Sequence, residues 1–588
     1  MSLLSDLGDR FGAAFEALGF EPELGEVVRS QRPELGQFQC NGALAAGNRA
    51  GRDPRDIAQE VIDLMDDHAI LAELEVAGPG FINLSVSDDH LRERLATLAA
   101  DERFGVPIVD KPKRVLIDYG GPNISKALHV GHLRSTIIGD SLLRLFRFAG
   151  HPAVGDIHIG DWGTPMGMLI IELERRSPDL PYFDRSFEGP YPEDSPITIE
   201  ELGMLYPAAA ARAESDPEIA ERARAATKDL QQGRPGYLAL WQHLSDVSRA
   251  SHEADFAALG VKFDLWYGES TVRGRIEDLI SEIEESGAAD HSDGALIVAV
   301  SEPDDRKEIP PLMLMRSDGG YLYSTTDLAT IQMRAAELGF ELALYVVDAR
   351  QALHFEQLFR AARKTGVAPP SLVLEHVPFG TVNGPDGKPF RTREGGVVLL
   401  SDVIEMVQEA AAGRLEEAEL AREYPPAEQA EIARRVGLAA LKFGDLINHR
   451  TSNYTFDLDR FASFEGKTGP YLQYGAVRMR SILRKASERG FDAGPVTAAA
   501  HPSERELVLL LLLAPETVAR SIDARAPNHV AEFAYEVTTQ FNRFYDHCHV
   551  LREEDLDQRG SWLTLVAATL RNLELLLELL GIEVPNRM

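Results

Sequence analysis

The sequence predicts an α/β protein with a doubly wound parallel sheet at its centre, and two observations carry the prediction. Short apolar runs alternate with longer helical patterns between about residues 106 and 400. The first of these runs leads through a Gly/Pro turn into a helix that begins with two histidines. Parallel strands need crossover connections, which are usually helices, so this alternation favours a parallel sheet covered on both faces.

Residues 1–105 are expected to form a separate, small α+β domain. Helical periodicity near 2–18 and 54–68 is followed at 78–84 by a Gly/Pro turn that leads into a strand. Apolar residues with a period near 3.6 indicate an amphipathic helix, while Gly and Pro mark turns. We interpret 107–114 as the linker to the next domain.

The central domain, residues 106–400, is expected to hold four strands and the helices that follow them. The strands are predicted at 115–117, 153–159, 343–347 and 372–375. The helices are predicted at 133–148, 165–175, 327–338 and 351–365. We interpret the stretch from about 176 to 300, which is rich in Ala, Glu and Arg, as a helical insertion with periodicity at 214–231 and 236–258.

The last third of the chain is expected to be almost wholly helical. Turn signals near Pro425, Gly490, Pro515 and Pro527 separate long helical patterns. We therefore predict a helical connector at 401–455 and an α-helical bundle at 456–588.

Length, charge and cysteine content limit the classes of function. A chain of 588 residues is too long for one hydrophobic core. It has no apolar run long enough to span a bilayer and no secretory signal pattern, so we expect a cytoplasmic protein without membrane contact. Cys40 and Cys548 lie too far apart in sequence to suggest a disulfide framework or a metal cluster.

The net charge of −33 argues at first against a nucleic-acid partner. The charge is not uniform, however, because the stretch 466–490 is rich in Lys and Arg and contains a single acid, Glu488. Local charge decides whether a phosphate backbone can bind. Binding of a nucleic acid at this stretch therefore remains open.

The turn after the first strand has the layout of a nucleotide-phosphate site. The strand ends at Asp118, Asn123 and Lys126 follow in the turn, and His129 and His132 lie at the start of the next helix. Backbone N–H groups and the dipole at a helix start favour anions, and a glycine, Gly131, leaves room for a base or ribose. An isolated His-x-Gly-His stretch would be equally compatible with two surface histidines.

Several motifs in order resemble the class I arginyl-tRNA synthetases. The resemblance lies in Pro122–Asp140, Gly160–Thr164, Tyr321–Leu328, Tyr345–Gln351 and Asp386–Arg393, and it extends from Gly78 to the final Met588. It implies a class I Rossmann-like catalytic domain. It further implies an enzyme that activates L-arginine with ATP and Mg²⁺ and transfers it to tRNA(Arg), with an activation step that needs bound tRNA.

The resemblance also implies a role for individual residues. His129 and His132 would stabilise charge on the α-phosphate, which is electrostatic and not covalent catalysis. The nucleotide pocket would be shaped by Gly131, Gly160, Asp161, Trp162 and Gly163. The substrate guanidinium, always charged and planar, would be held by Asp118, Tyr323 and Asp327, and its α-amino and carboxylate groups by Asn123 and Gln351.

The second catalytic loop departs from the class I pattern. Class I enzymes usually carry a Lys-Met-Ser-Lys type sequence there, but this chain has Pro-Phe-Arg-Thr-Arg at 389–393. Many arginyl-tRNA synthetases share this gap, and the resemblance implies that a lysine just before the paired histidines replaces the missing one. Lys126 fits that role, while Arg391, Arg393 and Lys388 remain secondary candidates. The sequence leaves open which of them replaces the missing lysine.

Aromatic and basic residues at the start of the bundle are candidates for tRNA binding. Stacking faces and cations together suit unstacked bases, and the candidates are Tyr471, Tyr474, Arg478, Arg480 and Arg484. The tyrosines could equally pack between helices. By the same resemblance the N-terminal domain contacts the tRNA elbow, with Gln39 and Asn41 as weak candidates.

Three alternatives stay open at this point. A class I synthetase for cysteine would need thiol zinc ligands, and one for glutamate would need a basic pocket. A small-molecule nucleotidyltransferase would not need the N-terminal domain or the helical bundle. A non-catalytic tRNA-binding paralogue would not need the complete set of candidate site residues. We expect a monomer, and the anticodon bases that are recognised are not predicted.

Overall fold

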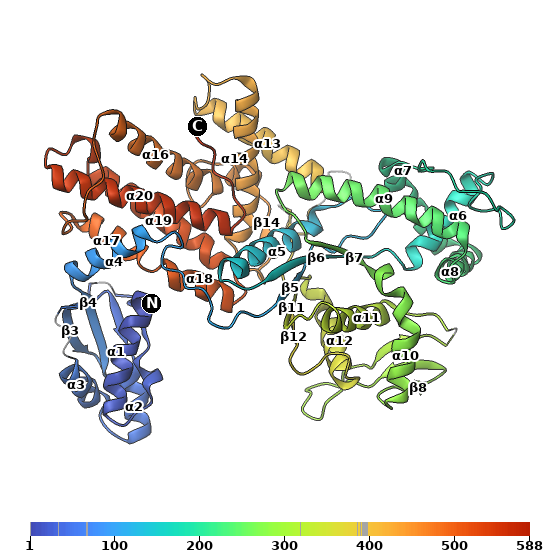
Figure 1. Cartoon of the computed structure of the whole chain (residues 1–588), viewed down its shortest axis with the longest axis horizontal. Coiled ribbons are helices and arrows are strands. Elements are labelled where there is room, and N and C mark those ends of the chain that lie inside the picture. The colour runs from blue at the N-terminus through green and yellow to red at the C-terminus, as the bar shows by residue number, and fades with distance from the viewer. Residues whose placement is uncertain are drawn as a thin grey trace. The chain divides into compact units, whose positions relative to one another are not determined.

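The computed structural model describes residues 2–32, 34–65, 69–317, 319–384, 386–388, 390 and 398–588. It contains two compact units (Figure 1). Unit 1 comprises residues 1–109, 414–439 and 463–588, and unit 2 comprises residues 110–413 and 440–462. Among the described residues, no helix is long and apolar enough to cross a membrane.

Unit 2 contains the predicted parallel sheet. Its strand order is β12-β11-β5-β6-β7, and every neighbouring pair is parallel. The strands are β5 (Val115–Asp118), β6 (Ala153–Ile159), β7 (Leu265–Gly268), β11 (Leu342–Tyr345) and β12 (Val373–His376). The four strands predicted from apolar runs are therefore confirmed as β5, β6, β11 and β12. All residues of β5 and β11 are buried, as expected for strands of a parallel sheet that is covered on both faces.

The helices of the sheet connect strands in opposite directions from β5. The chain runs from β5 through α5 (Val130–Phe148) to β6 on one side, whereas β11, on the other side, leads through α12 (Ala352–Lys364) to β12. Right-handed crossovers of opposite direction place their helices on opposite faces. The order therefore reverses between β5 and β11, and ligands bind at the carboxyl ends of strands at such a point.

The expected helical insertion at 176–300 is only partly confirmed, because three strands, at 265–268, 290–292 and 295–298, interrupt it. After β6 the chain forms α6 (Thr164–Arg176), α7 (Ile199–Ser215), α8 (Pro217–Gln231) and α9 (Pro235–Ala258). It then returns to the sheet as β7, which pairs with β6. Leu265–Gly268 is a short, half-buried segment without the apolar run that marks the other strands, so the sequence pattern did not reveal it.

A second insertion follows β7. It contains η2 (Glu269–Arg275), α10 (Ile276–Glu285) and an antiparallel sheet of β8 (Asp290–Ser292), β9 (Ala295–Val298) and β10 (Leu312–Met315). The helix α11 (Tyr323–Ala336) comes next. Leu279, Leu296, Leu314 and Leu328 belong to one buried apolar cluster that also contains residues of the parallel sheet. This cluster fixes η2 and α11 beside the sheet.

The rest of unit 2 includes a short parallel strand pair, β13 (Val382–Asn383) and β14 (Tyr454–Thr455). The predicted connector at 401–455 holds α13 (Leu400–Glu417) and α14 (Pro426–Leu446), each of which has residues in both units, and α15 (Leu458–Phe461) follows the connector in unit 2. Arg134, which is buried in α5, pairs with Asp445 of α14 at 3.0 Å, and Asp445 also accepts a hydrogen bond from the Tyr454 hydroxyl. This buried network joins the helix of the paired histidines to β14.

Unit 1 contains the predicted α+β domain and the helical bundle. The domain has an antiparallel sheet, β1-β2-β4-β3, with β1 (Val27–Arg29), β2 (Phe38–Cys40), β3 (Leu71–Ala77) and β4 (Phe81–Val86). Its helices are α1 (Leu3–Ala17), η1 (Pro22–Gly25), α2 (Gly42–Ala50), α3 (Pro54–Leu64) and α4 (Asp88–Ala100). The bundle helices are α16 (Gly469–Glu488), α17 (Pro502–Leu511), α18 (Ala514–Asp523), α19 (Asn528–His547), η4 (Val550–Arg552) and α20 (Leu556–Leu579).

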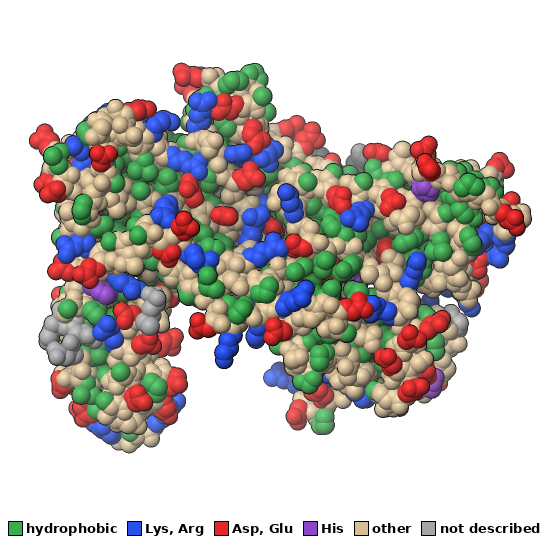
Figure 2. Space-filling view, viewed as in Figure 1, with side chains coloured by type: hydrophobic (Ala, Val, Ile, Leu, Met, Phe, Trp, Pro, Cys, Tyr) green, Lys and Arg blue, Asp and Glu red, His purple; other side chains and the backbone are tan. Residues whose placement is uncertain are grey.

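Acidic and basic side chains are interspersed over the face drawn in Figure 2. The net charge of −33 therefore does not form one uninterrupted acidic surface on that face.

Candidate active site

The two predicted histidines form a compact pair at the start of α5. His129 is the N-cap residue, and its Nδ1 accepts a hydrogen bond from the Gly131 N–H at 3.0 Å. The Nδ1 of His132 accepts a hydrogen bond from the His129 N–H at 3.1 Å. The ring centroids lie 4.0 Å apart. We call His129 and His132 the histidine pair.

These hydrogen bonds define the protonation state of the pair. An Nδ1 that accepts a hydrogen bond carries no proton, so each neutral ring must carry its proton on Nε2. Burial lowers the pKa of His129 and lowers that of His132 to about 3, which keeps both rings neutral at physiological pH. Each Nε2–H is therefore a hydrogen-bond donor for an oxygen of a bound anion.

The backbone of the helix start behaves differently from what we expected. We predicted that its N–H groups would point at the phosphate. Instead, the Val130 N–H donates to Val398 O, the Gly131 N–H to the His129 ring, and the His132 N–H to His129 O. The donors of the first turn are satisfied within the chain, so the imidazole Nε2–H groups and the helix dipole remain to stabilise an anion.

Glycines allow the close approaches that the site contains. A side chain at Gly131 would come within 2.7 Å of the His129 ring, so this glycine is needed by the histidine pair itself. A side chain at Gly160 would lie 2.1 Å from Asn123 Oδ1. At Gly163 the nearest atom would be 3.4 Å away, an ordinary contact. Gly131 and Gly160 are therefore required by contacts within the protein, with His129 and Asn123 respectively. The expected close approach of a nucleotide to Gly163 stays a prediction.

The side chains of Asp161 and Trp162, in the loop from Gly160 to Gly163, are held by neighbouring elements. The Asp161 carboxylate accepts hydrogen bonds from the Ser270 N–H at 2.9 Å and from the Ser270 hydroxyl. The buried Trp162 ring packs edge-on against Trp241 of α9, with the centroids 5.2 Å apart. Both side chains thus hold the loop, and the expected nucleotide contact remains a prediction for the loop as a whole.

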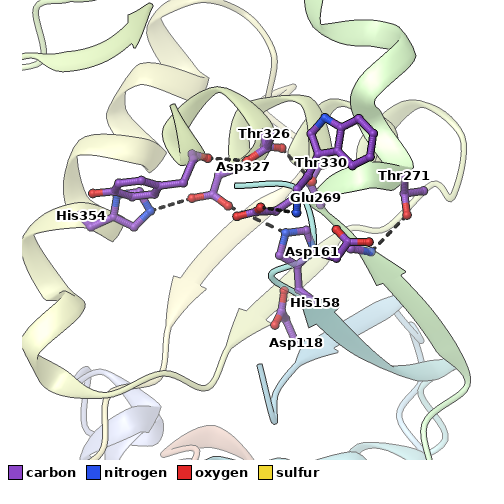
Figure 3. Close-up of polar contacts among 12 residues, drawn as sticks. Asp118, His158, Asp161, Glu269, Thr271, Thr326, Asp327, Thr330 and His354 are labelled. Carbon is purple, nitrogen blue, oxygen red and sulfur yellow. Dashed lines mark hydrogen bonds and ion pairs between the residues drawn. The ribbon is translucent and has the colours of Figure 1, made fainter. Parts of the chain in front are cut away.

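Asp327 lies between two histidines that the sequence did not single out (Figure 3). Its Oδ2 lies 2.8 Å from His354 Nε2, and its Oδ1 lies 4.0 Å from His158 Nε2. The ring of Tyr323, one turn before Asp327 in α11, lies against the His354 ring at 4.9 Å. Tyr323 is exposed, and the Asp327 side chain is 23% exposed. Both predicted substrate residues are thus together and accessible.

Glu269 joins this cluster from η2. Its Oε2 accepts a hydrogen bond from the Trp162 N–H at 3.2 Å. Burial, and then the nearby charges of Asp327 and Asp161, raise the pKa of Glu269 to about 7. Glu269 directly follows β7, just as Asp118 ends β5. Had β7 been recognised in the sequence, this position at a strand end would have made Glu269 a candidate site residue.

Asp118 is buried at the end of β5, where it already has a partner. It stands in register with Asp156 of β6, and Arg334 of α11 donates to the Oδ2 of both at 2.6 Å. Burial raises the pKa of Asp118, and Asp327 raises it further. The predicted contact of Asp118 with a substrate guanidinium stays a prediction in which the carboxylate is shared with Arg334. We call Asp118, Asp161, Glu269 and Asp327 the carboxylate cluster.

The remaining predicted residues of the catalytic unit lie at the same strand ends. Asn123 is exposed and forms an isolated parallel bridge with Gly160. Gln351 is exposed at the start of α12. The Lys126 ammonium lies over the ring of Tyr206, 4.3 Å from its centroid.

Arg391 and Arg393 lie outside the described residues, so their predicted role is not examined by the structure. The described segments on both sides of them are anchored. The Phe390 N–H donates to Val382 O, and Leu399 forms a bridge with His129. Lys388 is described and exposed.

The predicted tRNA residues on α16 fall into two groups. Tyr471 accepts a hydrogen bond from Asn542, and Arg478 stacks on Tyr474 with its guanidinium 4.9 Å from the ring centroid. Arg484 is largely exposed, 3.8 Å from Glu488. These side chains remain candidates for RNA contacts.

Arg480 differs from the rest of α16. It pairs with Glu574 of α20 at 2.6 Å and donates to Pro585 O at 2.8 Å. Its predicted RNA contact would have to compete with these contacts inside the bundle, so the structure supports it less than the others. In the N-terminal domain, Gln39 donates to Asn83 at 2.9 Å, while Asn41 is exposed.

Comparison with known proteins agrees with this architecture. The family model described as tRNA synthetases class I (R), catalytic domain, matches residues 95–458. The models for the DALR anticodon binding domain and the arginyl tRNA synthetase N terminal domain match residues 472–588 and 5–86.

Individual relatives match over the full length. The arginine–tRNA ligase of Maricaulis maris (strain MCS10) is 50% identical over 588 residues, which is 100% of both chains. That of Hyphomonas neptunium (strain ATCC 15444) is 49% identical and covers 100% of both. The crystal structure of arginyl-tRNA synthetase from Plasmodium falciparum covers 100% of this chain and 99% of that one, with a TM-score of 0.82 and 25% identity.

A parallel sheet with a histidine pair at its switch point, together with these matches, defines a class I aminoacyl-tRNA synthetase, and therefore an aminoacyl-tRNA ligase. The chain belongs to the arginyl-tRNA synthetase family.

Proposed function

We propose that this enzyme activates L-arginine with ATP to give arginyl-adenylate and pyrophosphate, and then transfers the arginyl group to tRNA(Arg) with release of AMP. The observation that carries the specificity is the carboxylate cluster, in which a partly exposed Asp327 is flanked by His354 and lies near Glu269. A guanidinium is always charged and binds carboxylates in a fork geometry. A substrate with a neutral or anionic side chain would leave these carboxylates uncompensated.

The histidine pair would act on the phosphate. During activation, negative charge builds up on the α-phosphate as the arginine carboxylate attacks and pyrophosphate leaves. The neutral rings of His129 and His132 would each donate their Nε2–H to phosphate oxygens. Lys126, just before the pair, would add the positive charge that a second-loop lysine supplies in other class I enzymes, with Arg391 and Arg393 as the alternatives.

The arginine backbone groups would be bound at the same edge of the sheet. Asn123 and Gln351 are exposed at this edge and would orient the α-amino and carboxylate groups. Tyr323 would lie along the aliphatic part of the side chain. This arrangement would place the arginine carboxylate between the carboxylate cluster and the histidine pair.

Magnesium would enter with ATP. In the described part of the chain, no group of three His, Cys, Asp or Glu residues is placed to hold a metal ion. A Mg²⁺ ion would instead be held mainly by the ATP phosphates and water, and it would neutralise phosphate charge there. We further propose that the enzyme acts in the cytoplasm as a monomer.

The rival specificities fit the site less well. Cys40 and Cys548 are both buried in unit 1, so unit 2 contains no cysteine that could supply thiolate ligands for a cysteine enzyme. A glutamate enzyme would need cations where the carboxylate cluster lies. The matched anticodon-binding and N-terminal domains disfavour a small-molecule nucleotidyltransferase.

Aminoacylation of total tRNA with each of the twenty amino acids tests this proposal. We expect arginine alone to be attached, and pyrophosphate exchange to be close to zero until tRNA is added. Attachment of another amino acid, or of none, would refute the assigned specificity.

A further inference from the structure

The ring of Tyr206 in α7 provides the surface on which the Lys126 ammonium lies, 4.3 Å from the ring centroid. We propose that Tyr206 is a positioning residue, which holds Lys126 beside the histidine pair so that its charge reaches the ATP phosphates. This inference rests on the phosphate role of Lys126 proposed above. It gives the insertion between β6 and β7, which contains α6 to α9, a part in the activation step.

The backbone around Lys126 is also held by this insertion. The Ser125 N–H donates to the Ser248 hydroxyl at 2.8 Å, and His252 Nε2 donates to Lys126 O at 2.9 Å. Ser248 and His252 are fully buried in α9. Ser125 has a φ of +70°, a left-handed conformation that costs free energy in a residue with a side chain. Contacts from α9 therefore maintain a strained turn, and Tyr206 from α7 then fixes the side chain that the turn carries.

An aromatic partner suits a lysine that must bind phosphate. In the part of the chain that the structure describes, no carboxylate forms an ion pair with Lys126. Its ammonium instead lies over the ring of Tyr206. A carboxylate would neutralise the ammonium and compete with the phosphates. The face of a ring attracts the cation through its quadrupole and leaves the full positive charge in place. Tyr206 can thus restrict the side chain without lowering its net charge.

The ammonium also lies near the histidine pair. Burial is the main reason that the pKa values of His129 and His132 are lowered, and the positive charge of Lys126 lowers both further. The ammonium that lies against the Tyr206 ring is thus within electrostatic reach of both histidine rings.

A double-mutant cycle between Tyr206 and Lys126 tests the inference on the full-length enzyme. The measured rate is arginine-dependent ATP–pyrophosphate exchange in the presence of tRNA. Tyr206→Leu removes the ring face and should lower kcat about threefold to thirtyfold, the range of one cation–π contact. Tyr206→Phe keeps the face and should stay close to wild type. In a Lys126→Ala background, Tyr206→Leu should cause no further loss.

Tyr191→Leu is the matched control, because Tyr191 is a half-buried tyrosine of the same insertion that stacks on Tyr182. It should change kcat by less than about twofold, while a loss of insertion structure would appear in both variants. The inference is overturned if Tyr206→Leu has wild-type kcat, or if it lowers kcat equally in the Lys126→Ala background. If Lys126→Ala itself has no effect, the proposed role of Lys126 fails, and the inference fails with it.

Discussion

The histidine pair and the carboxylate cluster both lie beyond the carboxyl ends of the parallel strands but are constructed differently. The hydrogen bonds that orient the pair link residues two and three positions apart. The contacts of the cluster join residues separated by 27 positions for His354 and Asp327, 107 for Trp162 and Glu269, and 216 for Arg334 and Asp118. The orientation of the two histidine rings therefore depends on neighbouring residues, whereas the carboxylate cluster exists only when distant elements pack together.

The two regions also differ in charge. The pair is neutral and satisfied by backbone groups, so it is fully formed before any ligand binds. The cluster holds four carboxyl groups, of which Arg334 pairs with Asp118, and burial, followed by the charges of Asp327 and Asp161, raises the pKa of Glu269 to about 7. A cationic ligand would complete it. The comparison predicts that changes in the two regions affect different measured quantities.

The largest effect is expected for Arg334→Met, which removes the cation buried between Asp118 and Asp156. Breaking a buried ion pair on one side costs about 3–5 kcal/mol of folding free energy. Chemical denaturation followed by the fluorescence of Trp162, Trp241 and Trp266 would measure it, since all three lie in unit 2. His132→Ala serves as the comparison. If it destabilises unit 2 as much as Arg334→Met does, the distinction between a local and a long-range region fails.

On the phosphate side, His132→Ala should reduce kcat of arginine activation about 10²–10³-fold, the usual loss for one preorganised donor to a charged transition state. The Michaelis constant for arginine should change little. Because the pKa of His132 is about 3, its protonation should contribute no pH dependence between about pH 6 and 9. Single-turnover activation measured across this range provides the check. A rise in the arginine constant as large as the fall in kcat would mean that the two regions are not separate.

A smaller effect is expected from pH on the arginine side. The pKa of Glu269 is about 7 without ligand, mainly because of burial, so below pH 7 the group is mostly protonated. A bound guanidinium favours the ionised carboxylate, and the proton must leave when arginine binds. The Michaelis constant for arginine should therefore rise as pH falls below about 7, by at most about tenfold per pH unit.

Glu269→Gln separates this effect from the neighbouring histidines. His354 and His158 also face Asp327, and burial lowers the pKa of His158. The variant should have a higher arginine constant that no longer depends on pH through Glu269. An unchanged pH dependence would mean that Glu269 is not the titrating group.

The same contrast explains what the sequence could predict. Four strands, the helix start and the histidine pair follow from local apolar runs and short spacing, and all are present. Tyr323 and Asp327 were predicted through the resemblance, and the structure places them one turn apart on α11. Arg334, Asp156 and His354 were missed, since strand register and helix packing bring them to the site. Glu269 was missed because β7 lacks an apolar run.

The most direct test of the account is the effect of Asp327→Ala on the Michaelis constants for arginine and ATP. Asp305→Ala is the matched control, because it removes a carboxylate of the same unit that pairs with Arg360 instead. Loss of a charge-assisted contact of about 1.5–3 kcal/mol predicts an arginine constant raised about 10- to 150-fold, with the ATP constant changed less than about twofold. An unchanged arginine constant, or equal increases in both constants, would contradict the claim that the carboxylate cluster selects arginine independently of the histidine pair.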